Sequence, residues 1–270
     1  GVEEYSGSEE TIYLKLCRAV VLAAVFLLPV FFLPWTTSVL EFNKQLLLIG
    51  LSGAALILWL LHVVVSGRFT WRPNSVDAAV VSVLVASVLA PIFSVSRFKS
   101  LFGLTSSLSE SFVVVIALSI FYFISVHSFQ DKGQKIKTAL GYSLFLSLLF
   151  GLLQIFGLHI FKYLNFSAIG GSATIFKFTE AKAFNTIGSI NSLGLVAAVT
   201  LPLFYRFEES LNIGKVGAVL ALVLLILLNW WVLWVVAIAG MVSLIALESA
   251  ERGSRFKISR FLFPMTVIVL

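Results

Sequence analysis

The feature that most constrains this chain is a succession of apolar segments, each of about the length that crosses a membrane. A helix needs about 20 apolar residues to span the hydrocarbon core of a bilayer. Runs of this kind cover residues 16–35, 45–65, 76–93, 111–127, 138–158 and 186–205. A further stretch, 213–247, is too long for one span and suits two short spans broken near Asn229, while 261–270 is only about half a span. We therefore predict an all-α, polytopic transmembrane helical bundle with about eight spans and the start of a ninth.

The composition agrees with a membrane protein and argues against a nucleic-acid-binding one. Apolar residues make up 59% of the chain and charged residues 12%, whereas soluble domains are about 45–50% apolar. The chain has 19 lysines and arginines against 13 acidic residues. These basic residues lie in short loops beside apolar runs, where they indicate orientation in the membrane rather than a nucleic-acid surface. We expect membrane lipids, and no nucleic acid, as partners.

The residues that usually build metal or hydrolytic centres are scarce. Cys17 is the single cysteine, and the three histidines lie far apart in the sequence, so neither a disulfide framework nor a histidine metal cluster is expected. The sequence has no GxGxxG, GxxxxGK[ST], HExxH or GxSxG motif. Nucleotide hydrolysis, zinc proteolysis and serine hydrolysis therefore lose support. We expect neither a metal nor a cofactor.

The distribution of basic residues predicts the orientation. With the amino terminus in the cytoplasm, thirteen of the 19 lysines and arginines fall inside and six outside, which agrees with the positive-inside rule. The acidic start of the chain lacks the basic segment of a signal peptide, so the first apolar run is interpreted as an anchor. We predict a cytoplasmic segment at 1–15, a transmembrane domain at 16–270 in the inner membrane, and a long outer loop at 159–185. We also expect the sequence to be the amino-terminal part of a longer protein.

Polar residues gather where one of the apolar runs begins. Asn185, Thr186, Ser189, Asn191 and Ser192 lie in the first turns of the predicted span 186–205. Polar groups inside a bilayer must find a partner in the protein or line a wet cavity, so their concentration suggests a functional site. The alternative is that they bond to their own helix, with Gly188 and Ser192 allowing close helix packing. The position of this span entrance directly after the basic outer loop favours the functional interpretation.

Four basic residues are predicted to face outward beside the membrane: Arg97, Lys99, Lys177 and Lys182. Arginine and lysine at that level suit a diphosphate or another anion, although anionic lipid headgroups would explain any one of them equally well. The outer loop that carries two of these lysines is also rich in phenylalanine. It is interpreted either as a lid over a cavity or as an aromatic belt at the membrane interface. Elsewhere, Asp77 after Asn74 and Ser75 is typical of a helix start rather than of catalysis.

Three stretches, taken in order, resemble the O-antigen ligase and O-antigen polymerase family of membrane glycan transferases. They are EFNKQLLL with the following span and RPNSVD (Glu41, Lys44, Arg72, Pro73 and Asp77), FSVSRFKSLFG (93–103) and FNTIGSINSLG (184–194). The resemblance implies transfer of a glycan from a polyprenyl diphosphate donor to a lipid or protein acceptor at the outer face of the cytoplasmic membrane. It also implies that Arg97, Lys99, Lys177 and Lys182 hold the diphosphate, and that Asn191 bonds the sugar or organises the cavity.

The chain departs from the family pattern at two places. It reads Gly188-Ser189-Ile190-Asn191 where a GNPN-like sequence is common, and Asn229-Trp230 where a Ser-Arg pair is often found. The family's outer loop with the histidine implicated in catalysis would lie beyond Leu270, so no catalytic residue is assigned. Two other functions remain open. One is a transporter or flippase in which Asn191 and the break at Asn229 line a pathway, and the other is a membrane anchor without activity.

Overall fold

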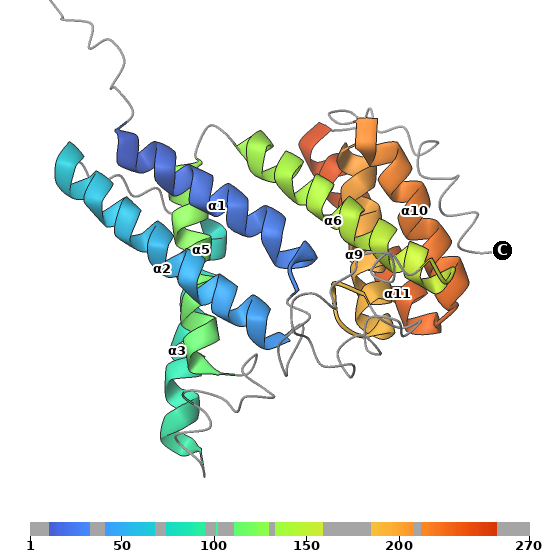
Figure 1. The fold of residues 1–270 in the computed structure, drawn as a ribbon, viewed down its shortest axis with the longest axis horizontal. Helices are drawn as coiled ribbons and strands as arrows, with labels where there is room; N and C mark the ends of the chain where they lie inside the picture. The colour runs from blue at the N-terminus through green and yellow to red at the C-terminus, as the bar shows by residue number, and fades with distance from the viewer. Residues whose placement is uncertain are drawn as a thin grey trace, which may run out of the picture. The chain divides into compact units, whose positions relative to one another are not determined.

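The described part of the chain is helical throughout (Figure 1). The computed structural model describes residues 11–32, 41–67, 74–94, 101, 111–129, 133–158, 185–207 and 212–252. These residues contain eight α-helices and no strand: α1 (Ile12–Val30), α2 (Glu41–Ser66), α3 (Ser75–Phe93), α5 (Phe112–Ser128), α6 (Gly133–Ile155), α9 (Ile190–Phe207), α10 (Asn212–Leu228) and α11 (Trp231–Arg252). The predicted all-α class is confirmed for the described residues, and each of the eight predicted segments overlaps one helix.

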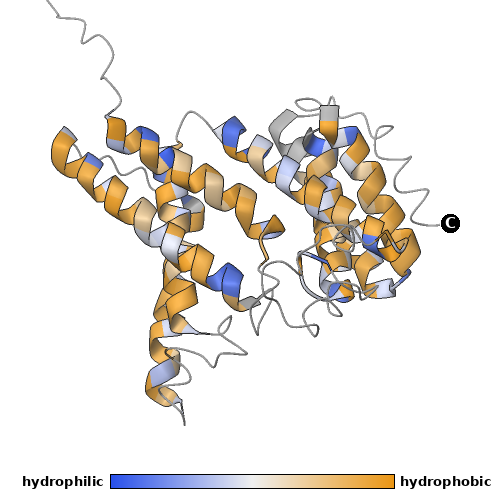
Figure 2. Ribbon diagram, viewed as in Figure 1, coloured by the Kyte–Doolittle hydropathy of each residue, from blue (hydrophilic) through white to orange (hydrophobic). Residues whose placement is uncertain are grey.

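The helices are apolar along most of their length (Figure 2). Four are long and apolar enough to cross a membrane by length and composition, namely Ile12–Val30, Phe42–Ser66, Val76–Phe93 and Gly133–Ile155. The other four, Phe112–Ser128, Ile190–Arg206, Ile213–Leu228 and Trp231–Ala246, are shorter apolar helices. These features support a membrane protein. The predicted ninth run, 261–270, lies outside the described residues, as does the predicted outer loop except for Asn185.

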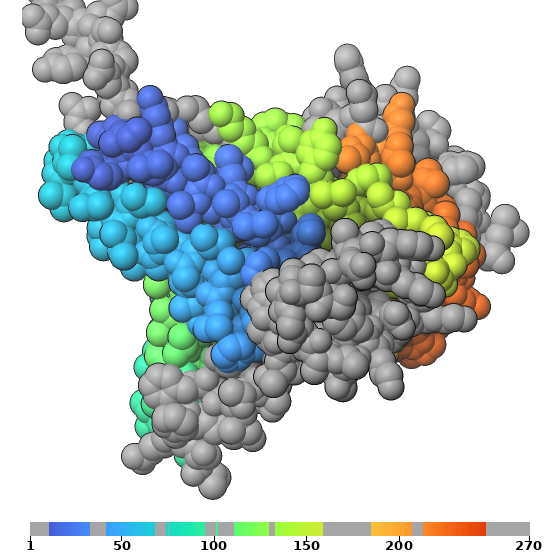
Figure 3. Space-filling view, viewed as in Figure 1, coloured from blue at the N-terminus to red at the C-terminus, as the bar shows by residue number. Residues whose placement is uncertain are grey.

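The chain forms two compact units, 1–139 and 140–270. In the first unit α1 and α2 run antiparallel, because Thr11 contacts His62 near one end of the pair and Lys44 contacts Pro29 near the other. Figure 3 shows their side chains touching along the length of the two helices. Their shared core joins Cys17, Val21 and Ala55 to apolar residues of α5. Burial of this apolar surface holds the three helices together.

Polar contacts join α1 to α5 and to α2 at one end of the first unit. The charges of the loops predict that this end is cytoplasmic. Nε of Arg18 donates to the carbonyl oxygen of Ser128, 2.6 Å away at the end of α5, and the guanidinium lies 6.0 Å from the ring centre of Phe129. A cation is favourable there because the last carbonyls of a helix carry partial negative charge. Oγ1 of Thr11 is 2.6 Å from Nδ1 of His62. Arg18 therefore serves as a cap that links α1 to α5.

The helix start predicted around Asp77 is confirmed. Asn74 is the residue that precedes the first turn of α3, and its backbone N–H donates to Oδ2 of Asp77 at 2.9 Å. The other carboxylate oxygen, Oδ1, accepts a hydrogen bond of 3.0 Å from the Tyr122 hydroxyl of α5. Asp77 is buried. Both of its oxygens therefore have hydrogen-bond donors, as a buried carboxylate requires.

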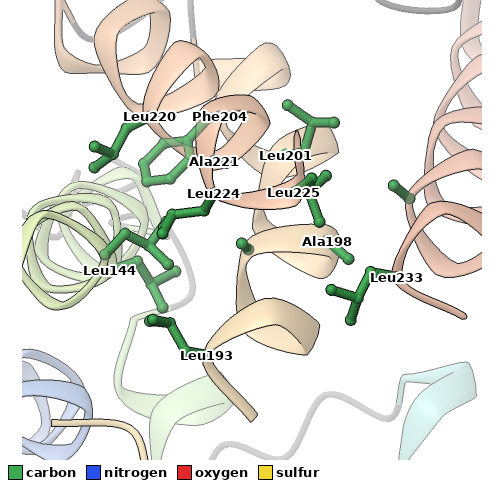
Figure 4. Close-up of a cluster of buried hydrophobic side chains, with 13 residues drawn as sticks. Leu144, Leu193, Ala198, Leu201, Phe204, Leu220, Ala221, Leu224, Leu225 and Leu233 are labelled. Carbon is green, nitrogen blue, oxygen red and sulfur yellow. The ribbon is translucent and has the colours of Figure 1, made fainter. Parts of the chain in front are cut away.

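The second unit is organised around α9 (Figure 4). Its largest buried cluster is contributed by α6, α9, α10 and α11, with Leu193 and Phe204 of α9 among its fully buried members. Glycines bring the partners close. A Cβ at Gly151 of α6 would lie 2.6 Å from a methyl group of Leu193, and a Cβ at Gly217 of α10 would lie 2.7 Å from the Phe204 ring. Such close approach is typical of packed membrane helices.

The same contacts give the directions of α10 and α11. Gly194 faces Leu228 at the end of α10, while Phe204 faces Gly217 nearer its start, so α10 runs antiparallel to α9. Gly194 also faces Leu233 of α11, and Pro202 faces Gly240, so α11 runs parallel to α9. The chain therefore reverses between Leu228 and Trp231, where Asn229 has a φ of 40°. This left-handed conformation is one that asparagine adopts more readily than most residues. The predicted break of 213–247 near Asn229 is confirmed.

Candidate functional site

The head of α9 is built by two side chains that bond to the backbone. Oδ1 of Asn185 accepts hydrogen bonds from the N–H groups of Ile187, at 3.0 Å, and Gly188, at 2.8 Å. Oγ of Ser189, which precedes the first residue of the helix, accepts the N–H of Ser192 at 3.1 Å. The bond from Ser189 satisfies an N–H that has no partner within the helix, as a serine cap does. Asn185 is almost completely buried, at 1% exposure.

Gly188 is required by this turn rather than by helix packing. Its φ is 146°, in a region that residues with a side chain rarely adopt. A Cβ at this position would meet only Ser192 of its own helix, at 3.8 Å and beyond. The alternative interpretation is therefore confirmed in part. Ser189 bonds to its own helix as that interpretation expected, but Gly188 and Ser192 are not a close helix-packing pair, and the closely packed glycine of α9 is Gly194.

Asn191 differs from the other polar residues in this segment. It lies in the first turn of α9. Its side chain is exposed, and this side chain makes no hydrogen bond with the described residues. Thr186 is buried, like Asn185. The segment thus separates into side chains that form its structure and one carboxamide, that of Asn191, which is accessible. A carboxamide offers both donors and an acceptor to a ligand.

The predicted cations lie outside the described residues. They are Arg97, Lys99, Lys177 and Lys182. Of the five predicted site residues, the structure therefore locates Asn191 alone. Among the described residues, no group of three or more His, Cys, Asp or Glu side chains could hold a metal ion.

A buried polar row on α6 was missed by the sequence analysis. Ser143, Ser147 and Gln154 are each 0% exposed. Their spacing of four and seven residues places them on one face of the helix. Within the described residues Oγ of Ser147 has no hydrogen-bond partner. The spacing was a readable signal, but polar residues scattered singly through an apolar run resemble ordinary helix-packing serines.

Comparison with known proteins finds no relative of this chain. No protein-family model, no curated protein and no solved structure matches the chain. The fold and the head of α9 therefore define the chain as a helical protein with membrane-span-like helices and an accessible amide at the start of one of them.

Proposed function

We propose that this chain is the membrane part of an enzyme that transfers a glycan from a polyprenyl diphosphate donor to an acceptor at the outer face of the cytoplasmic membrane. The support from sequence is the ordered set of three motifs that resemble the O-antigen ligase and polymerase family. The observation that carries the proposal is that the polar side chains at the head of α9 have two different roles. Asn185 and Ser189 bond to the backbone, which leaves Asn191 accessible to a substrate.

The chemistry of this donor explains why few specialised groups are needed. The diphosphate is itself the leaving group, so fixed cations that stabilise its developing charge supply much of the catalysis. Arg97, Lys99, Lys177 and Lys182 would hold the diphosphate, Asn191 would bond the sugar, and the lipid tail would lie among the spans. About eight spans with the amino terminus in the cytoplasm put all five residues at the outer face.

The test is glycan transfer in membranes that contain the full-length protein. We expect Arg97→Ala and Lys182→Ala each to lower the rate by at least about tenfold, because each removes a charge that stabilises the leaving group. Lys137→Ala is the matched control, since Lys137 is an exposed lysine of α6 near the predicted cytoplasmic side. Wild-type rates in both Arg97→Ala and Lys182→Ala would refute the assignment of the diphosphate site.

A second candidate function, a transporter or flippase for a lipid-linked or small substrate, is favoured by the buried polar row on α6. Ser143, Ser147 and Gln154 would line a polar path through the membrane. The break at Asn229 no longer supports this function, because the chain reverses there instead of continuing as a broken helix. Movement of the substrate across reconstituted vesicles without covalent change would favour transport over transfer.

A further inference from the structure

Three helices of the first unit have one end at a common level. Leu28 of α1, Leu48 of α2 and Val114 of α5 pack into one apolar cluster. Near this cluster α1 ends, at Val30, while α2 and α5 begin. The end of α1 and the starts of α2 and α5 therefore lie together just beyond the cluster. This junction is on the side of the membrane that the loop charges predict to be outer.

A lysine is held at this junction. Nζ of Lys44 donates to the carbonyl oxygen of Pro29, 3.4 Å away in the last turn of α1, and the Lys44 side chain is half-buried. Lys44 precedes Leu48 by four residues, which is about one helical turn. The end of a helix carries partial negative charge, so the contact with Pro29 accounts for the lysine. It does not account for the neutral polar groups nearby.

Two of these neutral groups are buried oxygens that have no hydrogen-bond partner among the described residues. They are Oε1 of Gln45 and Oγ of Ser111. Gln45 is 9% exposed and Ser111 is 0% exposed. Gln45 precedes Leu48 by three residues, so it lies on the side of α2 that packs against α5. A buried polar atom without a partner costs about 1–3 kcal/mol. Two such atoms at one junction indicate a polar ligand.

The start of α5 adds backbone donors to the same junction. Ser111 precedes the helix, and its side chain makes no capping hydrogen bond. Its carbonyl oxygen accepts the N–H groups of Val114, at 3.1 Å, and Val115, at 3.3 Å. The N–H groups of Phe112 and Val113 precede the first carbonyl that the helix offers. A helix start with donors of this kind favours an anion, and phosphate is the common one.

The groups at the junction share one chemical property, because all of them can donate a hydrogen bond to an anion. They are an ammonium group, a hydroxyl group, a carboxamide and the first N–H groups of a helix. A lysine beside such donors suits phosphate as a point charge. A neutral ligand would make no use of the lysine, so the junction favours a phosphate or a diphosphate.

We infer that Lys44, Gln45, Ser111 and the start of α5 bind the diphosphate of the lipid-linked donor. This inference rests on the proposed function, because it adds residues of the first unit to the diphosphate site of that donor. Lys44 thereby has two roles. It binds the end of α1 through Pro29, and it contributes positive charge to the ligand.

The experiment compares lipids that differ in their headgroup. The purified chain in nanodiscs of neutral lipid is titrated with polyprenol, with polyprenyl diphosphate, and with a sugar-bearing lipid, polyprenyl diphosphate that carries one hexose. We expect the wild type to bind polyprenyl diphosphate at least about tenfold more tightly than polyprenol. Lys44→Met should remove most of this preference, and Lys44→Arg should retain it because the charge remains. The loss in Lys44→Met should be equal for the bare and the sugar-bearing diphosphate, since Lys44 contacts the part that they share.

Ser111→Ala separates binding from folding. The Ser111 hydroxyl has no partner among the described residues, so its removal should leave the melting temperature unchanged or raise it. Affinity for polyprenyl diphosphate should nevertheless fall roughly fivefold, because one hydrogen bond to the ligand is lost. Ser111→Ala therefore decides the question even if Lys44→Met melts far below the wild type.

Lys137→Met is the matched control, since Lys137 is an exposed lysine of α6 and its loss should leave the preference unchanged. If the wild type prefers the diphosphate and both Lys44→Met and Ser111→Ala keep that preference, this site is refuted while the proposed function stands. If the wild type binds polyprenol as tightly as polyprenyl diphosphate, this inference and the diphosphate site of the proposed function both fail.

Discussion

The Tyr122 hydroxyl donates a hydrogen bond of 3.0 Å to Oδ1 of Asp77, which joins α5 to the first turn of α3. Most large apolar side chains of α3 are exposed, including Phe93 at 83%, as expected for a helix that faces lipid. Its main described helix contact is with α5. This partly buried polar pair therefore helps to fix how α3 packs against α5.

Tyr122→Phe should destabilise the first unit. The change removes the donor to Oδ1 of Asp77 but keeps the ring, so a buried carboxylate oxygen loses its partner. Such a loss costs about 1–3 kcal/mol. The measurement is thermal unfolding in detergent, with Tyr142→Phe as the control because Tyr142 is 46% exposed on α6. Equal melting temperatures for Tyr122→Phe and the wild type would show that the hydrogen bond does not stabilise the fold.

Substitution of glycines should have opposite effects at packed and open positions. In Gly217→Ala the new Cβ would lie 2.7 Å from two ring carbons of Phe204, and this ring is fully buried. We expect a loss of about 1–3 kcal/mol from overpacking. In Gly53→Ala no atom lies within 4 Å of the new Cβ, so the higher helix propensity of alanine should stabilise the protein by up to about 1 kcal/mol. Melting temperatures that fall equally in both variants would contradict the packing at Gly217.

The helices were predictable from the sequence because each coincides with an apolar run. The reversal at Asn229 was predictable too, since 213–247 exceeds one membrane thickness and a residue that tolerates positive φ lies within it. The number of membrane crossings does not follow from the helices alone. The helices α9 and α10 have 18 and 17 residues and so rise only about 27 and 26 Å, which is slightly less than the roughly 30 Å of a bilayer's hydrocarbon core.

The roles of the polar residues at the head of α9 were not predictable in the same way. Asn185 and Asn191 have the same side chain and lie six residues apart. Asn185 bonds to the backbone and is buried, whereas Asn191 is exposed. This difference depends on the turn at Gly188, and neither the hydropathy of the sequence nor the spacing of its polar residues predicts that turn.

The two asparagines should therefore respond differently to substitution. Asn185→Ala removes the acceptor for two backbone N–H groups, and we expect it to cost about 1–2 kcal/mol of stability, as the loss of a helix cap does. Asn191→Ala should leave the melting temperature within about 1 °C of wild type, because an exposed surface change costs little, while it weakens binding of the sugar-bearing lipid. Thermal unfolding of both variants in the same detergent tests this. A larger loss of stability in Asn191→Ala than in Asn185→Ala would reverse the two roles.

Cysteine labelling should show that three crossings separate Lys137 from Asn229. The described helices between these residues are α6, α9 and α10, and α6 is long and apolar enough to span. An odd number of crossings puts the two positions on opposite sides. The native Cys17 is fully buried, so it provides a background of low reactivity.

We expect a membrane-impermeant maleimide to label Asn229→Cys in cells with a permeabilised outer membrane, and to label Lys137→Cys only after the inner membrane is opened. The opposite pattern would reverse the orientation predicted from the basic loops. Labelling of both positions from the same side would mean that one of the three helices does not cross, and α9 and α10 are the shorter of them.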